Sequence, residues 1–418
     1  MKTYSNSSHV IIWANGYAFK LRVLDANRRP IAVSILADQI EEVLDTTRNP
    51  KQELNAATLS AFLSREEWTT VRAEVCEASP EAMEDIESAI TSIALHSTQP
   101  DAATDQLKLA KRDRQMVYSD KTFGFSVFTK GALACRAEHA TVDGGVLGQI
   151  MDLIHKVMSG IQTNTKPSTV SHPVQEISTA TTVGELPLSL LQCFDQETAL
   201  FRVSQHPDAL NLLRSKRLIN LVLQLTYQSA LSAVLDNAVI PVREPTSVRS
   251  FAKGRIDVNY VTTKESIAFC CYVREGNYGP KLLALFSATV RKYEQLQMES
   301  KSGIGLAVGI LELASSIRPL AESEDKAITI AAIASLKRRT AFFSGAPFAP
   351  SIITIEPFFQ DPEQVSFAYI GHNDHTVFSM IGTGKFTALL VPLQQAIGRF
   401  LVPISITAVM LATIEEGK

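Results

Sequence analysis

The sequence predicts a mixed α/β (α+β) protein, because segments with two different hydrophobic periods alternate along it. After residue 120, apolar side chains at Phe123, Phe125 and Val127 alternate with small or polar ones, which is typical of a strand. Residues 146–157 then place apolar side chains at helical spacing. Both patterns recur along the chain, so we expect mixed sheets flanked by helices.

The first 160 residues predict one domain. Residues 9–25 predict a hairpin, because Asn15-Gly16 lies between two apolar runs. The polar run 96–113 predicts a surface loop or a frayed helix. Helices are expected at 32–47, after the capping box Ser64-Arg65-Glu66-Glu67, and at 79–95.

Residues 161–185 are rich in Ser, Thr, Pro and Val without a helical period, which indicates a linker. A second domain is expected at 186–418. Its predicted helices are 208–235, 280–298 and 385–400, and its predicted strands are 258–262, 266–273, 352–355, 365–370 and 375–380.

Composition excludes several classes of protein. A net charge of −3 offers no basic field for nucleic acid, and the five cysteines are scattered. The N-terminus is polar and lacks a signal peptide. The uncharged run 400–414 contains Pro403 and is shorter than the ~20 residues of a membrane helix, so a buried strand or core helix is expected instead. We therefore expect a cytoplasmic protein without a membrane span.

Three short motifs resemble binding sites but are incomplete. His372-x-x-His375 is an isolated pair, and no metal site is expected there. Residues 382–385 lack the upstream glycine and the following Ser or Thr of a phosphate loop. Gly303-Ile304-Gly305 is not followed by the third glycine of a dinucleotide fingerprint. No tightly bound cofactor is predicted.

His139 is the candidate for chemistry. Leu133 and Cys135 continue the alternation that begins at Phe123, so two short strands joined at Lys130-Gly131 are predicted. His139 follows the second of these strands, four residues before Asp143 and the glycines that precede a helix. Such a position presents a side chain to a cleft, and the near-neutral pKa of histidine suits proton transfer. A structural histidine is the alternative, and spacing alone leaves both interpretations open.

Six segments, taken in order, resemble the choline/carnitine acyltransferase family. They are His9–Lys20, Leu63–Trp68, Ser119–Phe123 followed by Glu138-His139 and Asp143-Gly144, Ile219–Leu225, Ser247–Asp257, and Gln364–Ile397. The resemblance covers nearly the whole chain but only the later part of the family, so the first of two coenzyme A-dependent acyltransferase-like domains is expected to be incomplete.

The resemblance implies two similar α/β domains that meet at a tunnel, with His139 as general base in the middle. Asp143 would orient the site, or alternatively cap the helix that follows. The family's oxyanion-stabilising Ser-Thr-Ser segment is absent, and Ser344 is the nearest hydroxyl. Arg214, Lys216 and Arg217 occupy the region of the lysines that meet coenzyme A phosphates; a solvated helix end is the alternative.

The acceptor-binding positions depart from the family pattern. By this resemblance the acceptor-binding positions are Arg243, Ser247 and Ile256. Arg243 stands where the family has its carboxylate-binding tyrosine, and Ile256 stands where the family has a threonine. The arginine that completes the carboxylate clamp falls at or beside Pro280. Since a carboxylate needs charged or hydroxyl donors, carnitine is not expected as the acceptor, although Arg243 leaves an anionic acceptor open.

The resemblance therefore implies an acyltransferase that moves an acyl group between a thioester and a small hydroxylated acceptor. Coenzyme A or acyl-coenzyme A would be the co-substrate. Related domains work beside polyketide synthases, so a carrier-protein thioester is a second donor and a polyketide synthase a second partner. The alternative is an inactive or truncated relative that acts as a binding or scaffold protein.

Overall fold

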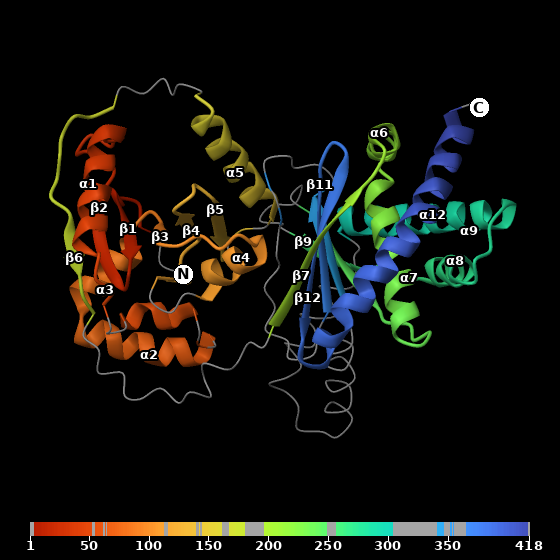
Figure 1. Ribbon diagram of the computed structural model, residues 1–418, viewed down its shortest axis with the longest axis horizontal. Coiled ribbons are helices and arrows are strands. Elements are labelled where there is room, and N and C mark those ends of the chain that lie inside the picture. Colours follow the sequence, from red (N-terminus) through yellow and green to blue (C-terminus); the bar gives the residue numbers. More distant parts are fainter. Residues whose placement is uncertain are drawn as a thin grey trace. The chain divides into compact units, whose positions relative to one another are not determined.

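The computed structural model divides the chain into two compact units, Met1–Cys193 and Phe194–Lys418. Each unit is built on one six-stranded mixed sheet with helices beside it (Figure 1). This confirms the mixed α/β class. The structure describes residues 4–51, 55–61, 63, 65–112, 116–138, 142, 144–160, 167–179, 196–248, 256–303, 341–346, 352, 354 and 365–416.

The first sheet has the strand order β5-β4-β3-β1-β2-β6. β1, β3 and β4 are parallel in its centre, and the three outer pairings are antiparallel. The predicted hairpin is confirmed, with Asn15 and Gly16 both at positive φ in its turn. The strands are β1 His9–Ala14, β2 Tyr17–Arg22, β3 Ser92–His96, β4 Phe123–Phe128, β5 Leu133–Ala137 and β6 Gln175–Ile177.

Both faces of β1 are buried, because helices cover the sheet on each side. Ile11 and Trp13 pack with Trp68 and Met83 on one face. Val10, Ile12 and Ala14 pack with Val43 on the other. The helical elements of this unit are α1 Val33–Thr46, η1 Ala56–Ala61, α2 Arg65–Ala78, α3 Pro80–Ser88, α4 Ala103–Arg112 and α5 Gly144–Met158.

The second sheet has the strand order β7-β12-β11-β10-β8-β9. β8, β10 and β11 are parallel in its centre, between antiparallel pairs. The strands are β7 Gln196–Ser204, β8 Val242–Ser247, β9 Ile256–Tyr260, β10 Ala341–Ala346, β11 Val365–Gly371 and β12 His375–Thr383.

One face of the second sheet carries the larger core. Phe343, Phe367 and Tyr369 form a row of rings there, and Tyr227 stacks on the first two. The helical elements that contribute to this core or precede it are α6 Pro207–Ser215, α7 Ile219–Val234, α8 Lys264–Arg274, α9 Pro280–Lys301, η4 Gly384–Leu389 and α12 Leu390–Glu416.

The two sheets share a five-strand arrangement. Read from one side, the first contains β2-β1-β3-β4-β5 and the second β9-β8-β10-β11-β12. In both, a hairpin, a single parallel strand and a second hairpin follow one another, with the same parallel and antiparallel pairings. The sequence shows no internal repeat, so this repetition is visible only in the backbone.

Two predicted elements were wrong. The helix predicted at 79–95 ends at Ser88, and Ser92–His96 is the parallel strand β3 between β1 and β4. Conversely, 266–273 is not a strand but part of α8. The Thr263 hydroxyl accepts from the Ser266 amide, and the Ser266 hydroxyl accepts from the Thr263 amide, which begins a helix despite the β-branched and aromatic residues that follow.

Four other predicted segments agree only in part with the structure or are only partly described by it. The polar run 96–113 contains α4, and the predicted linker 161–185 contains β6, which pairs with β2. The helix predicted at 208–235 is divided into α6 and α7, with Arg217 at positive φ between them. Two of the four residues of the strand predicted at 352–355 lie outside the described residues.

α12 contains the apolar run 400–414 and continues through Pro403, so the expected core helix is confirmed. Its inner face, which includes Leu393, Ile397 and Ile404, is buried in the core of the second unit. Among the described residues, Gly384–Glu415 is the single helical stretch that is long and apolar enough to cross a membrane. Core helices of soluble proteins pass the same test, so this is weak evidence for a membrane span.

Gly345→Ala is expected to destabilise the protein by about 1–3 kcal/mol. A Cβ atom at Gly345 would lie 2.3 Å from Cδ1 of Tyr369, whose hydroxyl donates to Asn220. The matched control is Gly398→Ala in α12, where the added methyl meets nothing within 4 Å and is expected to stabilise by up to about 1 kcal/mol. Urea unfolding measures both changes, and a neutral Gly345→Ala variant would contradict the packing described.

Candidate functional site

The segment around His139 joins β5 to α5. The Glu138 amide donates to the Thr122 carbonyl at 3.1 Å, and the Val142 amide donates to the Glu138 carbonyl at 3.3 Å. His139 and Asp143 themselves lie outside the described residues. The structure therefore describes how the flanks of this segment are held, while the roles of both side chains stay predictions.

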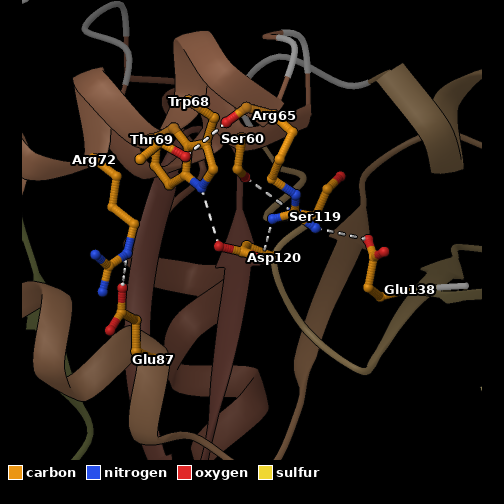
Figure 2. Close-up of polar contacts among 9 residues, drawn as sticks. All are labelled: Ser60, Arg65, Trp68, Thr69, Arg72, Glu87, Ser119, Asp120 and Glu138. Atoms are coloured by element: carbon orange, nitrogen blue, oxygen red, sulfur yellow. Dashed lines mark hydrogen bonds and ion pairs between the residues drawn. The ribbon is translucent and has the colours of Figure 1, made fainter. Parts of the chain in front are cut away.

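Arg65, at the start of α2, lies beside this segment. Its Nη1 donates to Oδ1 of Asp120 at 2.8 Å, and its Nη2 lies 3.5 Å from Oε2 of Glu138 (Figure 2). The indole Nε1 of Trp68, one turn along α2, donates to the other oxygen of Asp120 at 3.1 Å. Burial opposes ionisation of Asp120, but the hydrogen bonds from Arg65 and Trp68 outweigh it and lower the pKa of Asp120.

The next residue, Lys121, anchors the same loop to α3. Its ammonium group donates to the Glu87 and Ala89 carbonyls, both at 2.5 Å. These carbonyls are at the C-terminal end of α3, where the helix itself supplies no donors. Burial lowers the pKa of Lys121 to about 8. Asp120, Lys121 and Thr122 thus attach three neighbouring elements to one another.

Two of the acceptor-binding candidates, Arg243 and Ser247, share one face of the second sheet. Ser247 on β8 is paired directly with Ile256 on β9, and Arg243 is four residues earlier on β8. Since side chains alternate along a strand, Arg243 and Ser247 point to the same side, away from the α7 core. Arg243 is half-buried and Ser247 is exposed.

Ser344 lies on this same face. Phe342 on β10 is paired in parallel with Arg243, and Ser344 follows two residues later, so the two side chains emerge on one side of the sheet. Ser344 is half-buried and in register with Ala368 on β11. The register therefore brings Arg243, Ser247 and Ser344 to a common face, and the backbone of Ile256 is paired with Ser247.

A buried carboxyl group lies on the opposite face of β8. Oε1 of Glu244 accepts from the Tyr293 hydroxyl at 2.7 Å and from the Asn220 amide, and Asn220 in turn accepts from the Tyr369 hydroxyl at 2.7 Å. The other carboxyl oxygen, Oε2, has no hydrogen-bond partner within the described structure. Burial raises the pKa of Glu244 to about 7, although both hydrogen bonds act in the opposite direction. The sequence analysis missed this group, because no local pattern marks it.

The three basic candidates for coenzyme A lie at the end of α6 and have different surroundings. Arg214 donates to the His372 carbonyl, and burial lowers the pKa of Arg214. Lys216 and Arg217 are exposed in the turn before α7.

The histidine pair in the β11–β12 turn makes local contacts. The rings of His372 and His375 stack with centroids 4.3 Å apart, and Nδ1 of His375 lies 2.6 Å from Oδ1 of Asp374. Within the part of the chain that the structure describes, no three His, Cys, Asp or Glu side chains are grouped as metal ligands.

Comparison with known proteins gives one extensive match. Residues 1–381 match the family model described as Choline/Carnitine o-acyltransferase. No curated protein matches the sequence.

Solved structures show distant likenesses. The epimerization domain from the third module of tyrocidine synthetase B is 10% identical, over 77% of this chain and 82% of that chain, with a TM-score of 0.38. The wax ester synthase/diacylglycerol acyltransferase from Marinobacter aquaeolei VT8 is 9% identical, over 76% and 80%, with a TM-score of 0.36. Because these TM-scores are below 0.5, the likenesses add nothing to the family match.

Glu244→Gln is expected to remove a pH dependence of stability. In the folded protein the pKa of Glu244 is about 7, so it keeps its proton up to about that pH, whereas the unfolded chain releases the proton near the ordinary glutamate pKa of 4.5. The stabilising contribution of this proton is therefore present below pH 4.5 and lost as the pH rises through 7, a change of about 3 kcal/mol.

The measurement is urea unfolding of wild type and variant at pH 5 and pH 8. Relative to wild type, Glu244→Gln should gain about 2–3 kcal/mol between the two pH values. The matched control is Glu294→Gln, which removes an exposed carboxyl group from α9 and should show no such gain. Parallel pH profiles for wild type and Glu244→Gln would disprove the burial effect.

Proposed function

Because the chain belongs to the choline/carnitine O-acyltransferase family, we propose that it transfers an acyl group between a thioester and a small hydroxylated acceptor. The observation that carries the proposal is the family match over residues 1–381. That range includes Glu138-His139 and Asp143-Gly144, as well as the strands that bear Arg243, Ser247, Ile256 and Ser344.

In the proposed reaction His139 is the general base. Its neutral imidazole takes the proton of the acceptor hydroxyl while the oxygen attacks the thioester carbonyl carbon. A C–O bond forms, the tetrahedral oxyanion collapses, and the C–S bond breaks. The departing thiolate takes the proton back from the imidazolium, so ester and free thiol result without an acyl-enzyme. Such proton transfer contributes typically ~10²–10⁴-fold to a rate.

Two further side chains support this step in the proposal. Asp143 orients the segment that carries His139, and the hydroxyl of Ser344 donates to the developing oxyanion. Losing one oxyanion donor costs ~10²–10³ in rate, so Ser344→Ala tests that role. The half-buried position of Ser344, on the sheet face that also bears Arg243, favours this assignment.

The chemical class of the acceptor is inferred from the side chains at the acceptor-binding positions. Arg243 supplies a cation, Ser247 supplies an exposed hydroxyl, and Ile256 supplies neither. We infer a small polyol or amino alcohol, with an anionic group accommodated only by Arg243. Carnitine is not proposed, because its carboxylate would have one charged donor in place of a clamp.

The donor is proposed to be acyl-coenzyme A or an acyl chain on a carrier protein, including that of a polyketide synthase. Lys216 and Arg217 are exposed cations that would contact the phosphate groups of coenzyme A, and the Arg214 guanidinium beside them donates to the His372 carbonyl.

The altered acceptor-binding positions favour a second candidate function, an inactive relative that binds thioesters. Arg243 and Ile256 stand where the family has tyrosine and threonine, and a single hydroxyl, Ser344, is available for the oxyanion. Such a protein would still bind coenzyme A without turning it over. At 100 times the dissociation constant, the ligand would stabilise the fold by about 2.7 kcal/mol.

His139→Ala is expected to lower turnover ~10²–10⁴-fold. The assay supplies acyl-coenzyme A with a panel of polyols and amino alcohols, and follows the release of free thiol. The matched control is His155→Ala, which removes an exposed histidine from α5 and should retain wild-type turnover. Equal rates for wild type and His139→Ala would reject the catalytic role, and thermal stabilisation by coenzyme A without turnover would favour the binding function.

A further inference from the structure

Arg65 contacts two acidic residues that are distant from it in the sequence. Its Nη1 and Nη2 atoms reach Asp120, before β4, and Glu138, after β5, at 2.8 and 3.5 Å. Figure 2 shows the guanidinium group between the two carboxylates. β4 and β5 form an antiparallel hairpin, so Arg65 bridges the two open ends of that hairpin.

Backbone hydrogen bonds between β4 and β5 also hold the open end of this hairpin together. The Glu138 amide donates to the Thr122 carbonyl, and Phe123 is paired with Ala137 one step further along. The indole Nε1 of Trp68 donates to the second carboxylate oxygen of Asp120, so Asp120 is held by Arg65 on one side and by Trp68 on the other. Glu138 is thus secured by its amide, its carbonyl and its side chain.

Glu138 is covalently joined to His139. Fixing the side chain, the amide and the carbonyl of one residue restricts the backbone dihedrals at the start of the next peptide unit. We propose that Arg65 is a positioning residue: by pairing with Glu138 and Asp120 it fixes the backbone from which His139 extends. This inference rests on the proposed function, since it assigns Arg65 a task in that reaction.

The charge of the cluster gives Arg65 a second effect. Arg65 neutralises part of the two negative charges of Asp120 and Glu138, which border the His139 segment. Loss of Arg65 therefore leaves two neighbouring carboxylates without this shared cation and releases the end of β5.

Because the ion pair of Arg65 and Asp120 is partly exposed, Arg65 can be replaced without unfolding the protein. The Arg65 side chain is 58% exposed, and ion pairs of this kind contribute about 0–1 kcal/mol to stability. Arg72, two turns along α2, pairs with Glu87 at 2.5 Å and is less exposed, at 38%. Arg72→Gln is the matched control, since it removes an ion pair from the same helix without touching Glu138.

The first arm of the experiment measures backbone protection by hydrogen–deuterium exchange with mass spectrometry, on the full chain. In Arg65→Gln, peptides that cover residues 138–142 should exchange about two- to fivefold faster than in wild type, because their hydrogen bonds open more often. Arg72→Gln should leave these peptides unchanged. Unchanged exchange in Arg65→Gln overturns the inference, whether or not turnover is observed.

The second arm measures kinetics with acyl-coenzyme A and the best acceptor of the panel. Arg65→Gln should lower kcat about 10–100-fold and leave KM for the thioester within about twofold, since misplacing a base affects the chemical step. Arg65→Lys, which keeps the charge but not the fork, should restore only part of kcat.

The possible outcomes distinguish the proposed acyl transfer from the positioning role of Arg65. Equal turnover of wild type and His139→Ala rejects the proposed function, and the exchange arm still decides whether Arg65 holds the segment. Loss of turnover in His139→Ala, together with a wild-type kcat in Arg65→Gln, retains the function and overturns the positioning role.

Discussion

The parallel pairing at the centre of each sheet is the constraint on which the rest of the structure depends. Parallel neighbours cannot be joined by a tight turn, so the chain must cross over a face of the sheet between them. Between β1 and β3 the crossover contains α1, which covers one face, and α2 and α3, which cover the other. This route is what brings Arg65 to the open end of the β4–β5 hairpin, next to Glu138.

The repeated five-strand order relates the two units to each other chemically. The position after β5, where Glu138 and His139 stand, corresponds in the second unit to the position after β12, which holds Gly384 and Lys385. The β4–β5 hairpin is thus followed by the segment that contains His139, whereas the β11–β12 hairpin is followed by η4 and then α12. In the second unit the candidate side chains lie instead on the sheet face that bears Arg243, Ser247 and Ser344.

Local patterns were sufficient where local physics decides the structure. Asn15-Gly16 predicts the first hairpin because few residues adopt positive φ so readily, and the alternation through Phe123 and Phe125 predicts β4. Tertiary pairing overrode the pattern at Ser92–His96, whose apolar residues also fit a helical period. At α8 a capping box outweighed a run of strand-forming residues.

The surroundings of the candidate site were less predictable. The order of motifs along the sequence predicted roles for His139 and the acceptor-binding positions, but it assigned Arg65 only to a helix start. Its two carboxylate partners are separated from it by whole elements, and no spacing rule connects them. Glu244 was missed for the same reason, since its partners Asn220 and Tyr293 come from two different helices.

The two bonds that hold Asp120 respond differently to the medium. The indole of Trp68 is neutral and largely buried, whereas the guanidinium of Arg65 is more than half exposed to mobile ions. At an ionic strength of about 0.15 M the Debye length is about 8 Å, and more salt shortens it further. Rising ionic strength therefore loosens the link from Arg65 to Glu138 while the bond from Trp68 to Asp120 persists. The electrolyte around the protein sets how firmly the end of β5 is held.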